Sequence, residues 1–185
     1  VVTPTNTVVI NQESDFPIQD ATTITLSEKT RYVIGSAISS TKRFICEDGF
    51  VFTAENVLGV VYTYTGTGDM FTSTLAGGTV QDIALNAPNA NQGFNMSDTS
   101  LTKIFFCRNV RFQNVPKWGT YTGLLTAIIT LSSSSNSEDG LTIAGSGQLI
   151  LNLSAFAIIS TSATCVALDL TTAVISNIEL DNLIL

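Results

Sequence analysis

The sequence predicts an all-β protein: a right-handed single-stranded parallel β-helix of about five rungs, preceded by a short N-terminal β and arm region. Of its 185 residues, 44% are apolar and only 12% are charged, while Thr, Ser and Asn are abundant. Thr, Val, Ile and Phe favour strands, and Asn, Gly and Ser favour turns. Short phrases that alternate with period two also recur along the chain, which is typical of a solenoid built from strands.

The residue counts exclude several classes of function. The chain has no histidine, so His-dependent catalysis and His metal sites are absent. Its net charge of −7 argues against nucleic-acid binding, because neutralising phosphates needs clustered Lys and Arg. Cys46, Cys107 and Cys165 lie far apart, which fits buried thiols in a reducing compartment better than a disulfide or metal framework. We therefore expect no catalytic residue, no cofactor and no metal.

Nothing in the sequence predicts a membrane partner. The longest apolar run, residues 124–131, is much shorter than the ~20 residues that a transmembrane helix needs. Residues 1–4 lack the charged start and apolar stretch of a signal peptide. We therefore expect a protein that is made in the cytoplasm and stays off the membrane.

The first part of the chain, residues 1–43, is expected to serve attachment and capping. Residues 1–7 form a polar arm around Pro4, and residues 8–10 predict a first short strand. Brief β-type segments follow, separated by turn residues, at 16–17, 24–26 and 32–34. From residue 44 the pattern becomes repetitive, so residues 44–185 are expected to form the β-helix body.

One phrase recurs in this body: an apolar residue, an arbitrary residue and a second apolar residue before a polar turn. It occupies residues 48–52, 82–86, 109–114, 140–144 and 177–182, and its first apolar residues are 33, 27, 31 and 37 positions apart. Alternate side chains of a strand point to opposite faces, so the apolar pairs should stack inside the coil. The predicted core stack consists of Ile83, Leu85, Val110, Phe112, Leu141, Ile143, Ile178 and Leu180.

Asparagines close several of these phrases. Asn86, Asn114 and Asn182 are expected near one corner of the coil. Asn tolerates left-handed backbone angles at such corners, and its side chain can bond to the Asn of the next rung. The alternative fold is an antiparallel sandwich of many short strands.

Two acidic pairs are candidates for chemistry. Glu47-Asp48 and Glu138-Asp139 each precede a glycine. Paired carboxylates can act in glycoside hydrolysis or bind calcium. The position before a glycine favours a simpler interpretation, in which each pair marks the solvated entry to a turn.

The basic and aromatic residues supply two further candidate sites. All eight Lys and Arg lie between Lys29 and Lys117, with Arg108 and Arg111 as one local pair. Either this basic half docks on an acidic surface, or the distribution is chance in a chain with few charges. Trp118 and Tyr121 could form a platform for stacking on a glycan, and loop packing is the alternative interpretation of the same residues.

The first hundred residues resemble a recurrent type of tailed-phage virion protein. The segments that carry the resemblance are 16–17, 24–26, 29–34, 44–52, 64–71, 80–86 and 94–95. The resemblance implies a β-helical virion component that is usually trimeric, is made in the bacterial cytoplasm and is displayed outside the particle.

The expected function follows from this resemblance. We expect a non-enzymatic structural virion protein, a capsid decoration or cement protein that forms a homotrimeric knob on the head and binds the major capsid protein or another virion protein. The alternative is a receptor-binding segment of a tail fibre or spike that contacts host glycan. A polysaccharide-degrading enzyme is the third hypothesis, and it is disfavoured because the chain lacks the His that many β-helical pectin-degrading enzymes use.

Overall fold

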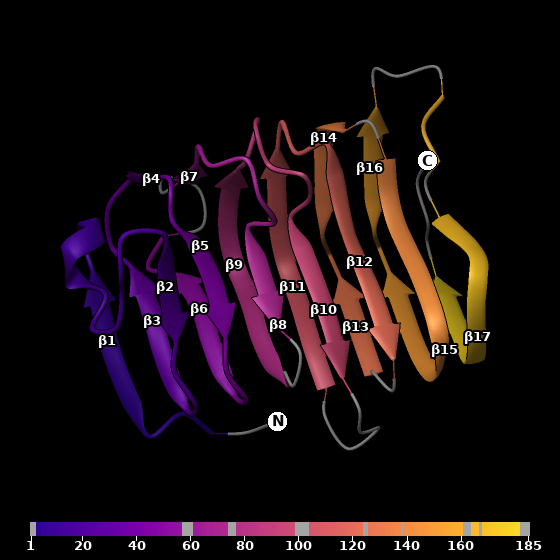
Figure 1. The fold of residues 1–185 in the computed structure, drawn as a ribbon, viewed down its shortest axis with the longest axis horizontal. Coiled ribbons are helices and arrows are strands. Elements are labelled where there is room, and N and C mark those ends of the chain that lie inside the picture. Colours follow the sequence, from indigo (N-terminus) through magenta and orange to yellow (C-terminus); the bar gives the residue numbers. More distant parts are fainter. Residues whose placement is uncertain are drawn as a thin grey trace.

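The computed structural model is a parallel β-solenoid of about six turns. It describes residues 3–56, 61–73, 77–98, 104–123, 126–137, 139–160, 164–166 and 168–181. Figure 1 shows that the strands follow one another along the long axis in chain order, so position in the sequence corresponds to position along the solenoid. The described residues include no helix that is long and apolar enough to cross a membrane. The predicted all-β solenoid is confirmed.

The described strands all belong to one sheet, and a single 3-10 turn, η1 (Glu13–Asp15), interrupts them near the N-terminus. Every pairing between these strands is parallel. The strands are β1 (Asn6–Ile10), β2 (Thr23–Leu26), β3 (Thr30–Ile34), β4 (Ile38–Ser40), β5 (Arg43–Cys46), β6 (Phe50–Ala54), β7 (Val61–Tyr64), β8 (Phe71–Ser73), β9 (Gly78–Asn86), β10 (Phe94–Asp98), β11 (Ile104–Gln113), β12 (Lys117–Gly123), β13 (Thr126–Thr130), β14 (Ser133–Ser137), β15 (Asp139–Ser154), β16 (Ala157–Ser160) and β17 (Leu168–Asp181).

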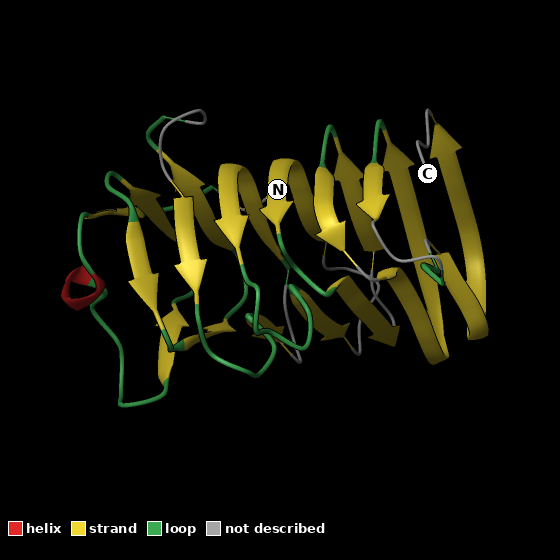
Figure 2. Cartoon of the chain, turned by 90° about the horizontal axis from the view of Figure 1, so that it is seen from above, coloured by secondary structure: helices red, strands yellow, loops and turns green. Residues whose placement is uncertain are grey.

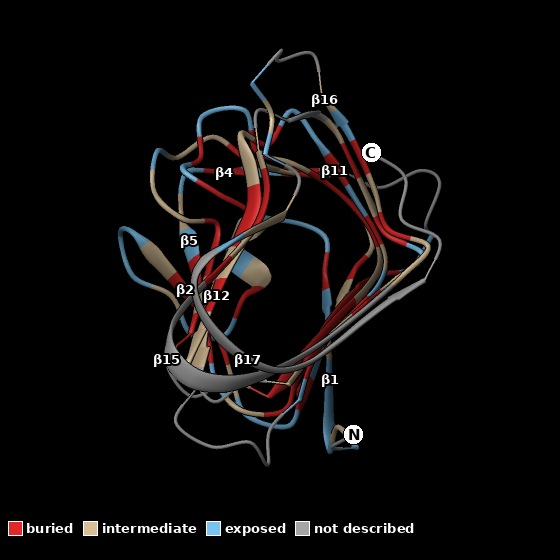
Figure 3. Ribbon diagram, turned by 90° about the vertical axis from the view of Figure 1, so that its right-hand side faces the viewer, coloured by how far each residue is buried: buried red, intermediate tan, exposed pale blue. Residues whose placement is uncertain are grey.

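The strand pairings give the coil three faces. Face A stacks β2, β5, β8, β10, β12 and the first parts of β15 and β17. Face B stacks β1, β3, β6, the first halves of β9 and β11, β13 and the later parts of β15 and β17. Face C stacks β4, β7, the second halves of β9 and β11, β14 and β16. Seen along its axis, the chain closes around a buried interior (Figure 3).

An aromatic column fills the interior behind face A. Phe44, Phe71 and Phe94 are in register on successive turns. The ring centroids of Phe44 and Phe71 lie 4.8 Å apart and those of Phe71 and Phe94 5.2 Å apart, which matches the spacing of parallel strands. Each ring that leaves water contributes about 1.5–3 kcal/mol, so this column is a main source of stability.

The column changes at the next turn, where the residue in register with Phe94 is Gly119. A Cβ at position 119 would lie 2.7 Å from the backbone oxygen of Phe94, so only glycine fits there. The neighbouring Trp118 continues the aromatic packing, with its ring 5.7 Å from that of Phe94 and 4.9 Å from that of Phe156.

The predicted core stack is correct for two of its four layers. Ile83 pairs with Val110 and Leu85 with Phe112 on face C, and all four side chains are buried. Leu141 and Ile143 lie instead on face A, opposite Gly119 and Tyr121. Ile178 and Leu180 lie on face B, opposite Leu151 and Leu153. The prediction failed because every face needs alternating apolar residues, so the same phrase occurs on all three.

The length of the turn explains this error. In-register positions on face A, from Ile24 through Phe44, Phe71, Phe94 and Gly119 to Leu141, are 20 to 27 residues apart. The predicted spacings of 33, 31 and 37 joined positions on different faces, and only the spacing of 27 between Ile83 and Val110 is a true turn. The solenoid therefore has about six turns rather than about five rungs.

The expected boundary at residue 43 is not a break in the fold. Ile24 pairs with Phe44, and Tyr32 pairs with Phe52, so residues before and after 43 share the same faces. The predicted strand at residues 8–10 is confirmed as part of β1 (Asn6–Ile10), which also takes in the end of the polar arm and pairs with β3 as the first layer of face B.

Residues 11–22 cover the N-terminal end of the solenoid (Figure 2). The Phe16 side chain is buried and its ring lies 5.9 Å from that of Tyr32, 5.6 Å from that of Phe44 and 6.4 Å from that of Tyr62. This ring therefore closes the end of the aromatic interior. We call residues 11–22 the N-terminal cap.

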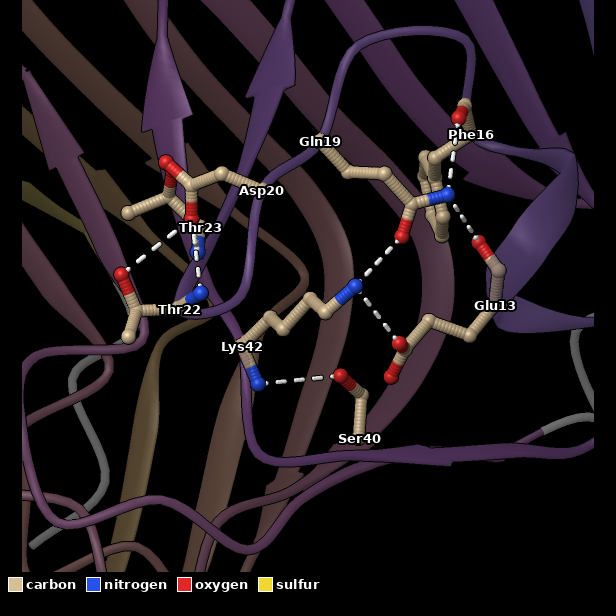
Figure 4. A network of polar contacts seen from close by, with 8 residues as sticks. All are labelled: Glu13, Phe16, Gln19, Asp20, Thr22, Thr23, Ser40 and Lys42. Carbon is tan, nitrogen blue, oxygen red and sulfur yellow. Dashed lines mark hydrogen bonds and ion pairs between the residues drawn. The ribbon is translucent and has the colours of Figure 1, made fainter.

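Polar contacts fasten the N-terminal cap to the turn between β4 and β5 (Figure 4). Lys42 Nζ lies 2.9 Å from Glu13 Oε1 and donates a hydrogen bond of 2.6 Å to Gln19 Oε1. Gln19 Nε2 in turn donates to the backbone oxygens of Glu13 at 3.1 Å and Phe16 at 3.0 Å. Lys42 thus holds both sides of the loop that carries the Phe16 ring.

Candidate functional site

A column of left-handed residues turns the chain from face B to face C. Asp82, Asn109, Leu131 and Ala155 have φ angles of 50°, 52°, 50° and 49°. The strand pairings immediately before and after these residues place them at the same position on four successive turns. We call them the corner column. One left-handed residue per turn lets β9 and β11 bend and continue on the next face.

The first two members of the corner column are joined by their side chains. Asn109 Nδ2 donates a hydrogen bond of 3.0 Å to Asp82 Oδ1, and Gln81 Nε2 donates one of 3.3 Å to Asp82 Oδ2. Both carboxylate oxygens of Asp82 therefore accept a hydrogen bond from an amide of the protein. Asp and Asn are also the residues that best tolerate left-handed angles, so the local sequence favours the bend.

A serine supports the same corner one turn later. Ser132 is buried, and its Oγ accepts a hydrogen bond of 3.1 Å from the backbone N–H of Val110. The same hydroxyl donates 2.9 Å to the backbone oxygen of Thr130. It thereby satisfies backbone groups at the bend between β13 and β14, where the ladder of strand hydrogen bonds is interrupted.

A groove of about 600 Å³ follows the corner column along the outside of the solenoid. We call it the corner groove. The residues that line it are Asp82, Arg108, Asn109, Arg111, Leu131, Ser132, Ser133, Ala155 and Ala157. Arg108 approaches it from face B and Arg111 from face C, and both arginines are exposed. Arg108 and Arg111, the local basic pair noted in the sequence, thus line the same groove.

The residues in register with the two arginines on adjacent turns are uncharged. Arg108 lies between Gln81 and Thr130 on adjacent turns. Arg111 lies between Ala84 and Ser133. Among the described residues, the ion pairs join Lys29 to Glu28 and Lys42 to Glu13, so neither groove arginine takes part in one. Both guanidinium groups are therefore available to an anion from outside.

The expected asparagine contact is confirmed for two residues. Asn114 Nδ2 donates a hydrogen bond of 3.1 Å to Asn86 Oδ1 on the preceding turn, and Asn114 has a left-handed φ of 53°. Asn182 lies outside the described residues. This contact stands at the end of face C, so the coil has a second corner where an amide side chain bridges two turns.

The predicted glycan platform is wrong. Trp118 and Tyr121 are both fully buried, and Trp118 Nε1 donates a hydrogen bond of 3.3 Å to Tyr121 Oη. Trp118 lies near the start of β12, where its ring packs against those of Phe94, Phe112 and Phe156. Burial raises the pKa of the Tyr121 hydroxyl well above its usual range. Neither ring can stack on a ligand from solvent.

The described residues of the two acidic pairs accept hydrogen bonds from backbone N–H groups. Glu47 Oε2 accepts a hydrogen bond of 3.0 Å from the N–H of Glu28, and Asp48 Oδ1 accepts one of 3.1 Å from the N–H of Gly77. Asp139 Oδ1 accepts one of 3.0 Å from the N–H of Val166, while Glu138 lies outside the described residues. These carboxylates join loops of neighbouring turns, as the turn-entry interpretation expects.

The cysteines are free thiols. Cys46 and Cys107 are buried, and Cys165 is partly buried. Burial raises the pKa of the Cys46 and Cys107 thiols, so both stay protonated and unreactive. The described residues contain no group of three or more His, Cys, Asp or Glu side chains that could hold a metal ion.

Comparison of the chain with known protein families, with curated proteins and with solved structures gives no match. The assignment of a function therefore depends on the fold and on the corner groove. The sequence pointed to part of this groove through the Arg108 and Arg111 pair. It did not point to Leu131, because an exposed leucine has no sequence pattern that separates it from a buried one.

Proposed function

We propose that the chain is a structural, non-enzymatic protein of a tailed-phage particle, in which it forms a homotrimeric knob that decorates the head. The observation that carries the proposal is an apolar stripe on the outer side of face B. Val9 and Ile104 are 54% and 39% exposed, and further apolar residues beside them are half-buried. The stripe consists of Val9, Val33, Val51, Ile104, Phe106 and Ile128.

The side chains of the stripe point outward, because side chains alternate between the two sides of each strand. Phe105 and Cys107 are buried on either side of Phe106, and Ala127 and Ile129 on either side of Ile128. Phe106 and Ile128 are in register on adjacent turns. An exposed apolar stripe in a chain with few charges favours association with another copy, because association removes this surface from water.

The N-terminal cap supports the same proposal. Its Phe16 ring closes the aromatic interior at the N-terminal end, which disfavours end-to-end stacking through that interior. Association through a side face is then the favoured route, and closed cyclic symmetry limits it to a defined number of copies. The resemblance of the first hundred residues to phage virion proteins favours three.

The number of copies per virion tests the assignment to the head. Quantitative mass spectrometry of purified particles should find this chain at a fixed ratio to the major capsid protein, with copies in the hundreds. A few trimers per particle would contradict decoration and place the chain in the tail. The corner groove favours that second function, a receptor-binding segment, because it offers unpaired arginines to a ligand.

A further inference from the structure

We infer that the corner groove binds an acidic saccharide, whose carboxylate or sulfate groups lie between Arg108 and Arg111. The inference rests on the groove alone and is independent of the trimer and of the location in a particle. Guanidinium groups form strong, directional hydrogen bonds with oxyanions, and two of them at one groove give a defined register for the ligand. The chain as a whole has a net charge of −7, so this pair is a local exception.

The carboxylate that lines the groove does not neutralise the pair by direct pairing. Both oxygens of Asp82 already accept hydrogen bonds from the amides of Asn109 and Gln81. Within the described part of the chain, Arg108 and Arg111 have no ion pair. Each guanidinium therefore keeps its donors free for a ligand.

The surroundings of the arginines favour a sugar over another anion. Gln81 and Thr130 are in register with Arg108 on neighbouring strands, and Ser133 is in register with Arg111. Their amide and hydroxyl groups can both donate and accept hydrogen bonds, as sugar hydroxyls do. The lining residues come from four successive turns, which span about 14 Å at about 4.8 Å per strand spacing. This length suits an oligosaccharide that runs along the axis.

Leu131 supplies an apolar contact in the middle of the groove. Leu131 is 57% exposed although its φ of 50° is unfavourable for a leucine. Asp82 and Asn109 occupy the same corner on earlier turns with residues that tolerate this angle. An exposed apolar side chain that costs backbone energy is consistent with a contact to the carbon-bound hydrogens of a sugar ring.

The test is calorimetric titration of the full chain at low salt with a galacturonate oligomer, a sulfated galactan oligomer and a neutral galactan oligomer. We expect at least one acidic oligomer to bind about tenfold or more tightly than the neutral one. Arg108→Gln and Arg111→Gln should each weaken that binding about tenfold. Which acidic oligomer binds distinguishes carboxylate from sulfate as the recognised group.

Arg31→Gln is the matched control, because Arg31 is an exposed arginine of face B that does not line the groove. It removes the same charge and should change the affinity by less than about twofold. Absence of binding by both acidic oligomers would overturn the inference, as would an equal loss in Arg31→Gln. Tighter binding of polyglutamate than of either acidic oligomer would also overturn it, and would assign the groove to an acidic polypeptide.

A second variant separates binding from folding. Leu131→Asn removes the apolar contact and places a residue that tolerates the left-handed angle in the corner column. We expect an unchanged or higher melting temperature together with about fivefold weaker binding of the acidic oligomer. Wild-type affinity in this variant would contradict the role of Leu131.

Discussion

Asn109 Nδ2 donates a hydrogen bond of 3.0 Å to Oδ1 of Asp82 on the preceding turn, and both residues have left-handed backbone angles. The pair thus supports the bend between faces B and C in two ways: the side chains bridge adjacent turns, and both residue types tolerate the backbone angle. The corner groove depends on this bend, because Arg108 and Arg111 lie on either side of Asn109.

The Asn109 bend predicts a graded effect of substitution. Asn109→Ala should lower the free energy of unfolding by about 2 kcal/mol, because it removes a charge-assisted hydrogen bond and places alanine at a left-handed angle. Asn109→Gly should cost less, since glycine adopts that angle freely. Urea denaturation of both variants measures the difference. Equal stability of Asn109→Ala and wild type would contradict the role of the corner column.

The register of face C predicts a large loss of stability at one position of β11 and a small loss at its neighbour. Phe112 is buried and its ring lies 5.2 Å from that of Trp118, so Phe112→Ala should cost about 3–5 kcal/mol of unfolding free energy. Arg111 is exposed on the other side of the same strand, and Arg111→Ala should cost less than about 0.5 kcal/mol. Thermal denaturation followed by circular dichroism checks both. A similar loss of stability in the two variants would contradict the assignment of Phe112 to the interior and of Arg111 to the outer surface.

Lys42 predicts a measurable contribution of the N-terminal cap. Its side chain is 17% exposed and contacts both Glu13 and Gln19, so Lys42→Ala should destabilise the protein by about 1–2 kcal/mol. The control is Lys29→Ala, whose ion pair with Glu28 is about half exposed and should contribute little to stability, because solvent screens it. Equal melting temperatures for the two variants would show that the Lys42 contacts do not hold the cap.

The acidic residues of the N-terminal cap predict loss of stability in acid. Hydrogen bonds from the backbone N–H of Thr22, from the hydroxyl of Thr23 and from the N–H of Thr23 lower the pKa of Asp20 from 3.8 to about 2. The hydrogen bond with Ser40 and the contact with Lys42 lower the pKa of Glu13 below 4.5. A carboxyl group with a lowered pKa stabilises the fold above its unfolded pKa and loses that effect as the pH falls through its folded pKa.

We therefore expect the melting temperature to fall as the pH is lowered from 4.5 to about 2. Asp20→Asn should make this fall smaller between pH 3.8 and about 2, while Glu13 and Asp15, whose pKa values are also lowered, keep their contributions. A melting temperature that rises over this interval would contradict the sign. Asp20→Asn leaves Glu13 and Lys42 in place, so the fall in melting temperature that remains in this variant comes from the other acidic residues.

The alternation within each strand was predictable from the sequence, while the assignment of strands to faces was not. Val110, Arg111 and Phe112 show by their pattern which side chains are buried, and the structure agrees. Leu141 and Ile143 have the same pattern but lie on face A, because the pattern records only that one side of a strand is buried. Turns of 20 to 27 residues also vary too much for spacing alone to fix the register.

The candidate site was only partly predictable for a related reason. The Arg108 and Arg111 pair stands out in a chain with eight bases, and the bend at Asn109 brings both to one groove. Leu131 and Ala155 complete the corner column although neither residue type indicates a left-handed angle. The sequence leaves Trp118 open to two interpretations, a glycan platform or loop packing beside Pro116 and Gly119, and neither predicts a ring buried in the core. The ring instead packs inside against Phe94, Phe112 and Phe156.

The apolar stripe on face B predicts that one charge placed there disrupts association. Ile128→Lys should convert the proposed trimer to a monomer, because a lysine buried in the interface without a partner is costly. Thr142→Lys is the control, since Thr142 is a half-buried residue on β15 of face A. Analytical ultracentrifugation compares the two variants. Dissociation by Thr142→Lys instead would assign the interface to face A.

The most direct test of the proposed function is the mass of the purified chain in solution. Light scattering at micromolar concentration should give about 59 kDa, the mass of three chains of 19.7 kDa each. A value of 19.7 kDa that persists with a cooperative melt would contradict the trimer, and with it the proposal that the chain forms a homotrimeric knob on a phage particle.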